Sequence, residues 1–504
     1  MKDLESELFN YTTGRFLQVS YIFANDALRL RERRRIFDIP GLFKIIAEAL
    51  HCKTEEIVGF RKLGEGGFKR TFLITLDTGF RLIARIPYPL LIPKAYALAS
   101  EVATMDFLRS KGLPIPKVYA YSSTPKNEAE TEYILMEYVE GTDLSQIWFD
   151  LKKDEIISLM GQLAKVESTM MSISFPAGGS IYYARDLKNL SRNEGIPLEE
   201  DEGTSPEKER FCIGPDVSVP LWYGRREQLD VFREPYKDAK SVLSSSYLDR
   251  FGSPRAPYQR FRREYYNYKK QPPSDHAENL HRYLRLAPSL VPDDDSLSAF
   301  CIRHPDLTDS NLKVSTDSSG LQILSMLDWQ HATILPLFVL AGMPDVIQNE
   351  EDEVSRRMVK PKLPDDFDKL AEEKQEWEME LFRRRLVHYH YIVSTATYNR
   401  IHRQGFCLPV FGWESFAKDG TPCPVVFTED KIAAARMLRD NVGCGEETWV
   451  PVTQYEEAKA IGQDIKRRTL EAFAEDEETT EEAYAMIEAN WPLDDMDEEL
   501  EEYK

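Results

Sequence analysis

The spacing of apolar residues predicts helices near the beginning of the chain. Within residues 27–51, apolar side chains recur from Leu42 to Leu50 at helical spacing. Pro40 and Gly41 separate this pattern from a shorter helical pattern before it. The first part of the chain therefore reads as a helical segment that precedes any strand.

From residue 60 the period of the pattern changes to two, which is typical of strands. Four segments show strand character: residues 70–76, 80–86, 119–121 and 133–138. Asp77-Thr78-Gly79 joins the first two as a tight turn, and a helical pattern over residues 97–111 ends at Gly112. This order predicts a small antiparallel sheet with one helix packed on it.

Beyond Gly141 the pattern is mostly helical and irregular. Residues 370–400 have the partial apolar periodicity of a long charged helix, and the end of the chain has the acidic composition of a solvated tail. We therefore predict an α+β fold with two lobes. Its parts are a helical N-terminal extension (1–58), a lobe built on the sheet (59–140), a larger, mainly helical lobe (141–470) and an acidic tail (471–504).

Composition narrows the classes of partner. The chain has 504 residues and a formal net charge of −21, which argues against nucleic-acid binding through phosphate contacts. No apolar run approaches the length of about 18 residues that spans a bilayer. The six cysteines have no metal-like spacing, and the acidic N-terminus has no presequence character, so both favour a cytoplasmic protein.

The strongest candidate for chemistry is His304-x-Asp306-x-x-x-x-Asn311, followed by Asp328. A predicted hairpin over residues 312–327 would return the chain, so that Asp328 lies near Asp306 and Asn311. In phosphoryl transfer, a carboxylate such as Asp306 accepts the proton of the attacking hydroxyl, and magnesium takes oxygen ligands such as Asn311 and Asp328. His304 would hold the backbone of the loop. The alternative is a polar turn between core elements.

Two further features fit a nucleotide site. Gly64, Gly66 and Gly67 lie between two predicted strands, where backbone amides would cover the phosphates of ATP; the alternative is an ordinary glycine turn. Arg85 lies on the second strand of the hairpin, where it would bind phosphate and pair with Glu101 on the following helix. The alternative for this pair is a salt bridge on the surface.

The end of the last predicted strand, from Glu137 to Val139, is a candidate adenine site. It connects the two lobes, so its backbone groups would act as a hinge that binds the base. The alternative is a plain turn between domains.

With these residues assembled, the chain resembles the aminoglycoside phosphotransferase/choline kinase-like family of the protein-kinase-like superfamily, and within it fungal proteins related to altered inheritance of mitochondria protein 9. The resemblance is carried by residues 9–15, 66–72, 84–89, 114–119, 134–138, 304–307 and 327–330. Trp329 follows Asp328 where protein kinases have Phe-Gly, which fits the branch that acts on small molecules.

The resemblance implies a two-lobed protein-kinase-like fold with ATP and Mg2+ as cofactors, Asp306 as catalytic base, and Asn311 and Asp328 as metal ligands. It also implies a small-molecule acceptor, bound by a large insertion in the second lobe, and a mitochondrial location. We therefore predict an ATP- and magnesium-dependent phosphotransferase that acts on a hydroxyl or amine of a small molecule. The alternative is a nucleotide-binding pseudokinase that serves as a scaffold without turnover.

Overall fold

The computed structural model describes most of the chain between residues 35 and 406, together with residues 449–451 and residue 467. The gaps within the first range are residue 67, 90–92, 192–193, 199–210, 223–231, 245–257, 261–272, 318–319 and residue 351. The predicted acidic tail, 471–504, and the first 34 residues of the predicted extension lie outside the described residues.

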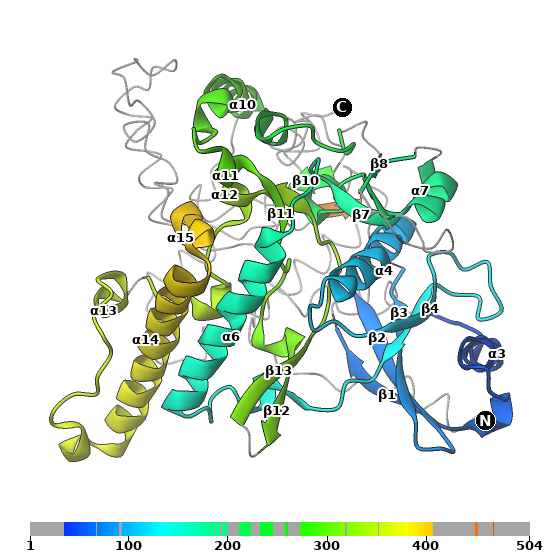
Figure 1. Cartoon of the computed structure of the whole chain (residues 1–504), viewed down its shortest axis with the longest axis horizontal. Helices are drawn as coiled ribbons and strands as arrows, with labels where there is room; N and C mark the ends of the chain where they lie inside the picture. Colours follow the sequence, from blue (N-terminus) through cyan, green and yellow to red (C-terminus); the bar gives the residue numbers. More distant parts are fainter. Residues whose placement is uncertain are drawn as a thin grey trace.

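A five-stranded antiparallel sheet forms the smaller lobe (Figure 1). Its strands are β1 (Ile57–Glu65), β2 (Lys69–Leu76), β3 (Arg81–Pro87), β4 (Val118–Ser122) and β5 (Tyr133–Glu137), in the order β1-β2-β3-β5-β4. Gly79, in the turn between β2 and β3, has φ 83°, a conformation that glycine adopts without strain. The predicted strands and their hairpin are therefore confirmed.

Helices cover both faces of this sheet. Helix α4 (Lys94–Ser110), the helix predicted on the sheet, shares a buried cluster with Leu73 and Ile83. Helix α3 (Ile39–Leu50) packs through Leu42 and Ile46 against the opposite face. Successive side chains of a strand point to opposite faces, so the strands of one sheet contribute to both cores.

Helix α3 begins at the residues that were predicted to separate two helices. Pro40 lies in its first turn, where the missing amide hydrogen costs nothing, and the side chain of Asp38 accepts a hydrogen bond from the Gly41 amide at 2.5 Å. A Cβ atom on Gly41 would lie 1.9 Å from the carbonyl oxygen of Glu128, so the helix needs glycine here to pack on the loop before β5.

The larger lobe is built around two long helices that lie side by side, α6 (Lys153–Ser172) and α14 (Glu372–Tyr398) (Figure 1). The helix predicted over residues 370–400 is thus confirmed. None of the described helices combines the length and apolar character needed to cross a membrane.

Further helices and strands, most of them short, belong to the described part of this lobe. The further helices are α5 (Leu144–Ile147), α7 (Ala184–Ser191), α8 (Val219–Trp222), α10 (Pro273–Leu286), α11 (Asp295–Ser298), α12 (Leu337–Leu340), α13 (Glu353–Arg356) and α15 (Arg400–Phe406). The strands are β6 (Thr142–Asp143), β7 (Ser180–Tyr183), β8 (Ile196–Pro197), β9 (Phe211–Gly214), β10 (Tyr258–Arg260), β11 (Phe300–Ile302), β12 (Leu312–Asp317), β13 (Gly320–Met326), β14 (Ile334–Pro336) and β15 (Trp449–Pro451).

The two lobes share one hydrophobic core. The cluster that contains Leu73 and Ile83 of the sheet also contains Trp329 and Tyr391 of the larger lobe. A backbone hydrogen bond of 2.8 Å from the Met326 amide to the carbonyl of Pro114 joins the lobes beside this core. The predicted two-lobed α+β fold is confirmed, and the candidate residues lie where its lobes meet.

Candidate functional site

His304 holds the turn that follows β11. Its ring is buried; Nδ1 accepts a hydrogen bond from the Asp306 amide at 3.1 Å, and Nε2 lies 2.8 Å from the carbonyl oxygen of Leu327. Because a carbonyl oxygen only accepts, Nε2 carries a hydrogen. Nδ1 carries none, because it accepts from an amide, so the ring is the neutral tautomer. Burial lowers the pKa of His304 accordingly. The ring packs edge-on against Trp329, with 4.6 Å between centroids.

Asp306 lies at the exposed tip of this turn, and Asn311 fixes it. The Asn311 side-chain amide nitrogen donates to the Asp306 carbonyl oxygen at 2.8 Å and to its carboxylate Oδ2 at 3.2 Å. Asn311 itself is buried at the end of a short 3-10 turn (Asp309–Asn311). One carboxylate oxygen of Asp306 is thus positioned by the protein, while the group remains open to solvent.

The hairpin of β12 and β13 brings Asp328 back to this turn, as the sequence predicted. Leu312 is paired with Met326, and the Leu327 amide donates to the Asn311 carbonyl oxygen at 2.8 Å. Asp328 has φ 65°, a left-handed conformation that is uncommon outside glycine and that is often retained at functional sites.

Arg85 and Glu101 form an ion pair, with Nη1 and Oε1 2.6 Å apart. Both side chains are more than nine-tenths buried, which distinguishes the contact from a surface salt bridge. Burial raises the pKa of the Glu101 carboxyl, and the neighbouring Arg85 guanidinium opposes that rise. The guanidinium also reaches Asp328, with Nη2 3.2 Å from Oδ1.

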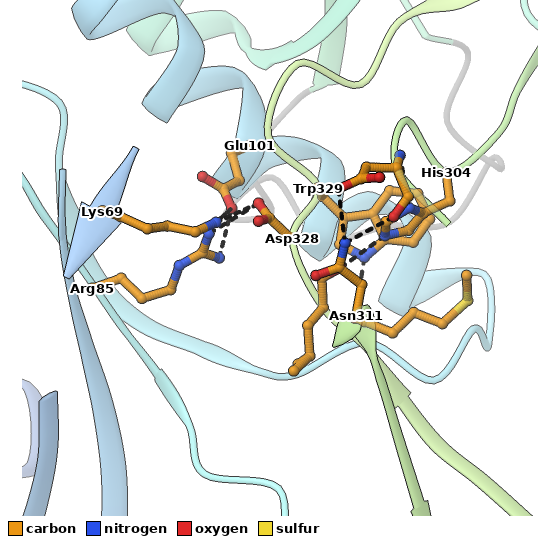
Figure 2. A network of polar contacts seen from close by, with 10 residues as sticks. Lys69, Arg85, Glu101, His304, Asn311, Asp328 and Trp329 are labelled. Atoms are coloured by element: carbon orange, nitrogen blue, oxygen red, sulfur yellow. Dashed lines mark hydrogen bonds and ion pairs between the residues drawn. The ribbon is translucent and has the colours of Figure 1, made fainter. Parts of the chain in front are cut away.

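Lys69, at the start of β2, completes this group and was missed by the sequence analysis. Its ammonium pairs with Asp328 and lies 3.9 Å from Glu101 (Figure 2). The strand pattern held a signal for it: Thr71 pairs with Arg85, and Lys69 is two residues from Thr71, so Lys69 points to the same face of the sheet as Arg85.

The glycine turn between β1 and β2 is flanked by an ion pair between the buried Arg70 and the more exposed Glu65. Gly66 donates from its amide to the Lys69 carbonyl oxygen at 2.9 Å, and a side chain on Gly64 would meet nothing within 4 Å. Glu65 accepts from Arg70 at 3.2 Å and from the Tyr88 hydroxyl. Burial opposes ionisation of Glu65, but hydrogen bonds from Tyr88, Lys62 and Arg70 outweigh it and lower its pKa to about 2. Gly67 lies outside the described residues.

Glu137 is engaged at the end of β5. Its amide donates to the Lys117 carbonyl oxygen at 2.8 Å, and its carboxylate accepts from the Lys117 amide at 2.9 Å. Val139 follows it, half-buried, between the lobes. Since the Glu137 amide and carboxylate are both used to hold β4, an adenine ring at this position would have to bind other backbone groups.

A buried polar group behind the turn of His304 was also missed by the sequence analysis. Arg303 pairs with Glu167 of α6 at 2.8 Å and donates to the Tyr391 hydroxyl of α14 at 3.3 Å; that hydroxyl donates to Glu167 at 2.6 Å. The three residues are far apart in the sequence, so no local pattern predicts their contact.

His331 lies beside the site, between the glycine turn and Val217. Its Nδ1 donates to the Val217 carbonyl oxygen at 2.8 Å, and its ring contacts Phe68 of the glycine turn, with 5.9 Å between centroids. Within the described part of the chain, its buried Nε2 has no hydrogen-bond partner. Burial lowers the pKa of His331.

The side chains fit a magnesium ion better than a soft or tetrahedral metal. Nowhere in the described ranges do three His, Cys, Asp or Glu side chains gather closely enough to hold a metal ion. Asn311 and Asp328 offer amide and carboxylate oxygens, and the Asn311 nitrogen is already turned to Asp306. Magnesium usually takes one or two such ligands and completes its shell with water and phosphate.

Comparisons with known proteins identify fungal relatives of this chain. A subtelomeric hrmA-associated cluster protein of Aspergillus fumigatus is 35% identical over 401 residues, covering 72% of this chain and 75% of that protein. Altered inheritance of mitochondria protein 9 of Candida dubliniensis, named as mitochondrial, is 28% identical over 285 residues, covering 49% of this chain and 42% of that protein.

Solved structures of phosphotransferases are similar to this chain at low TM-scores and low sequence identity. An ADP-bound aminoglycoside phosphotransferase has a TM-score of 0.32 at 12% identity, covering 79% of this chain and 96% of that one. A macrolide 2'-phosphotransferase has a TM-score of 0.30 at 12% identity, covering 82% and 100%.

The family itself is defined by sequence. The model of the phosphotransferase enzyme family matches residues 59–339, which is more than half of the chain. This range contains all the candidate site residues, from Gly64 to Asp328. The resemblance seen in the sequence is thereby confirmed, and the protein belongs to the phosphotransferase enzyme family.

Proposed function

We propose that this protein is an ATP- and magnesium-dependent phosphotransferase that acts on a hydroxyl or amine of a small molecule. The observation that carries the proposal is the arrangement of three side chains. Asp306 is held by Asn311 at the open tip of a turn, and the β12–β13 hairpin brings Asp328 to a position where it faces the buried Arg85–Glu101 pair.

Asp306 is the proposed catalytic base. It accepts the proton of the acceptor group as the acceptor atom bonds to the γ-phosphorus of ATP and the bond from that phosphorus to the ADP oxygen breaks. Asn311 keeps one carboxylate oxygen in place. His304 acts as a positioning residue, because it ties the backbone of Asp306 to that of Leu327.

The nucleotide is proposed to lie under the glycine turn. Amides around Gly64, Gly66 and Gly67 would cover the phosphates, and Arg85, oriented by Glu101, would bind them. Residues from Glu137 to Val139 are proposed to hold the adenine.

Asn311 and Asp328 are the proposed magnesium ligands. When bound, magnesium neutralises charge on the phosphates and aligns them. The conformation of Asp328 serves this role, since its left-handed backbone turns the carboxylate towards the sheet lobe, as Figure 2 shows.

Phosphoryl transfer in the presence of Mg-ATP tests the proposal. Purified protein is incubated with labelled ATP and a metabolite extract, and phosphorylated products are found by mass spectrometry. Asp306→Asn should lower the rate by about 10²- to 10⁴-fold, the usual contribution of a general base. The matched control is Asp309→Asn in the same turn, which should keep wild-type activity. Transfer that persists unchanged in Asp306→Asn would refute the assignment.

A pseudokinase is the second candidate, and the pairing of Asp328 with two cations favours it, because a proposed metal ligand is already neutralised. A pseudokinase would bind ATP without turning it over. ATP at about 100 times its Kd should then add about 2.7 kcal/mol to the free energy of unfolding while no phosphate is transferred.

We also propose a mitochondrial location, which rests on the names of the relatives, with the cytoplasm as the alternative. Fractionation of cells that carry the endogenous protein with a C-terminal tag separates the two. Recovery of the tag in the cytosolic fraction alone would exclude the mitochondrion.

A further inference from the structure

Two cations from neighbouring strands converge on one carboxylate. Lys69 comes from β2 and Arg85 from β3, and both contact Oδ1 of Asp328 (Figure 2). Glu101 stands on the other side of the pair. The four side chains together carry two positive and two negative charges, so the cluster is neutral as it stands.

The two cations are not equivalent within this cluster. The shortest contact of Arg85 is to Glu101, at 2.6 Å, so Arg85 keeps a buried partner whatever happens to Asp328. Lys69 lies 3.9 Å from Glu101, and its close contact is with Asp328. If Asp328 takes another cation as its partner, Lys69 loses its close partner and keeps only the more distant Glu101.

We propose that Lys69 is a second phosphate-binding cation that exchanges partners. It neutralises Asp328 while the site is empty and moves to a nucleotide phosphate when Asp328 binds the metal. This inference rests on the proposed function, because it needs a magnesium-nucleotide complex at this site. A lysine suits the exchange, since its ammonium is a point charge on a flexible stem, whereas Arg85 is held by its pair with Glu101.

The exchange predicts that removal of the Lys69 ammonium changes metal affinity and nucleotide affinity in opposite directions. Without the Lys69 ammonium, a divalent cation competes only with the more distant Arg85 guanidinium at Asp328, so metal binding in the absence of nucleotide should become tighter. The magnesium complex of the nucleotide should bind more weakly, because one phosphate contact is lost. A residue that merely supports the fold would weaken both.

The experiment measures two affinities of the full-length chain. Mn2+ binding without nucleotide is followed by electron paramagnetic resonance, and binding of a non-hydrolysable ATP analogue with Mg2+ is followed by calorimetry. For Lys69→Met we expect about tenfold tighter Mn2+ and about tenfold weaker analogue binding, the size of one charge-assisted contact. Lys69→Arg, which keeps the charge, should change both affinities less than Lys69→Met does.

Controls separate this inference from the proposed function. Lys44→Met removes an exposed lysine of α3 and should change neither affinity. Wild-type protein that binds neither Mn2+ nor the analogue overturns the proposed function and this inference with it. If the wild type binds both, but Lys69→Met shifts the two affinities in the same direction or leaves them unchanged, only the partner exchange is refuted. Should Lys69→Met not fold, Lys69→Gln is measured in the same way.

Discussion

At the scale of single residues, a buried group of polar side chains supports the proposed catalytic turn from behind. Arg303 precedes His304 and is held between α6 and α14 by Glu167 and Tyr391. Glu167 has no exposed surface, so the Arg303 guanidinium and the Tyr391 hydroxyl take the place of water at its carboxylate. A buried pair of this kind holds geometry, and removing one member leaves the other charge buried and unpaired.

Glu167→Ala is therefore expected to lower the free energy of unfolding by about 3–5 kcal/mol, because Arg303 would remain buried without its carboxylate. Urea unfolding followed by circular dichroism measures the change. Glu376→Ala, at an exposed position of α14, should stay within about 0.5 kcal/mol of wild type. A loss of less than about 1 kcal/mol in Glu167→Ala would show that Arg303 finds another partner.

Residue contacts that depend on the tertiary fold set the limit of prediction from sequence. His304, Asp306, Asn311 and Asp328 were found because a local motif and one hairpin bring them together. Lys69 and Asp328 are separated by 259 positions, and their contact depends on how the two lobes meet. The alternation along β2 showed which face Lys69 occupies, but it contained no information on what lies opposite that face.

At the scale of elements, the sheet and its hairpins could be read directly from period-two alternation and from turn residues such as Gly79. The first helix was harder, because proline and glycine both end helices and begin them. Helix α3 begins at Pro40 and Gly41 because the Gly41 amide donates a capping hydrogen bond to Asp38 and because the helix packs closely on the backbone of Glu128. Both contacts are visible only in three dimensions.

Two glycines in helices should respond to alanine with opposite signs. Gly161→Ala in α6 should raise the free energy of unfolding by about 0.5–1 kcal/mol, because nothing lies within 4 Å of the new Cβ and alanine favours the helix. Gly41→Ala in α3 should lower it by about 1–3 kcal/mol, because the Cβ would lie 1.9 Å from backbone of the neighbouring loop. Thermal or urea unfolding of both variants checks the pair; a stabilised Gly41→Ala would contradict the tight packing of α3.

At the scale of the whole molecule, buried histidines make stability depend on pH. Burial lowers the pKa of five histidines that are wholly or partly buried: His304, His331, His388, His390 and His402. For His402 the pKa falls to about 4, against an ordinary value of 6.5 for a histidine side chain. Between these two values the unfolded chain binds the proton and the folded chain does not, so stability falls as the pH is lowered through this window.

Lowering the pH from 7.5 to 5 should therefore cost about 2 kcal/mol for His402 alone, with further losses from the other four. The free energy of unfolding measured in urea at several pH values gives the slope. His402→Gln should reduce that slope by about one proton. An identical slope in wild type and in His402→Gln would show that this imidazole is protonated in the folded state.

The shared core has a consequence for how the molecule can be divided. Leu73 and Ile83 of the sheet lobe are buried in the same cluster as Trp329 and Tyr391. Cutting the chain between the lobes would expose apolar surface on both pieces, so neither half is a natural unit for separate expression or for recombination with another protein. The predicted boundary after residue 140 separates the sheet of the smaller lobe from the larger lobe. A module that is moved intact into another protein would have to include both lobes.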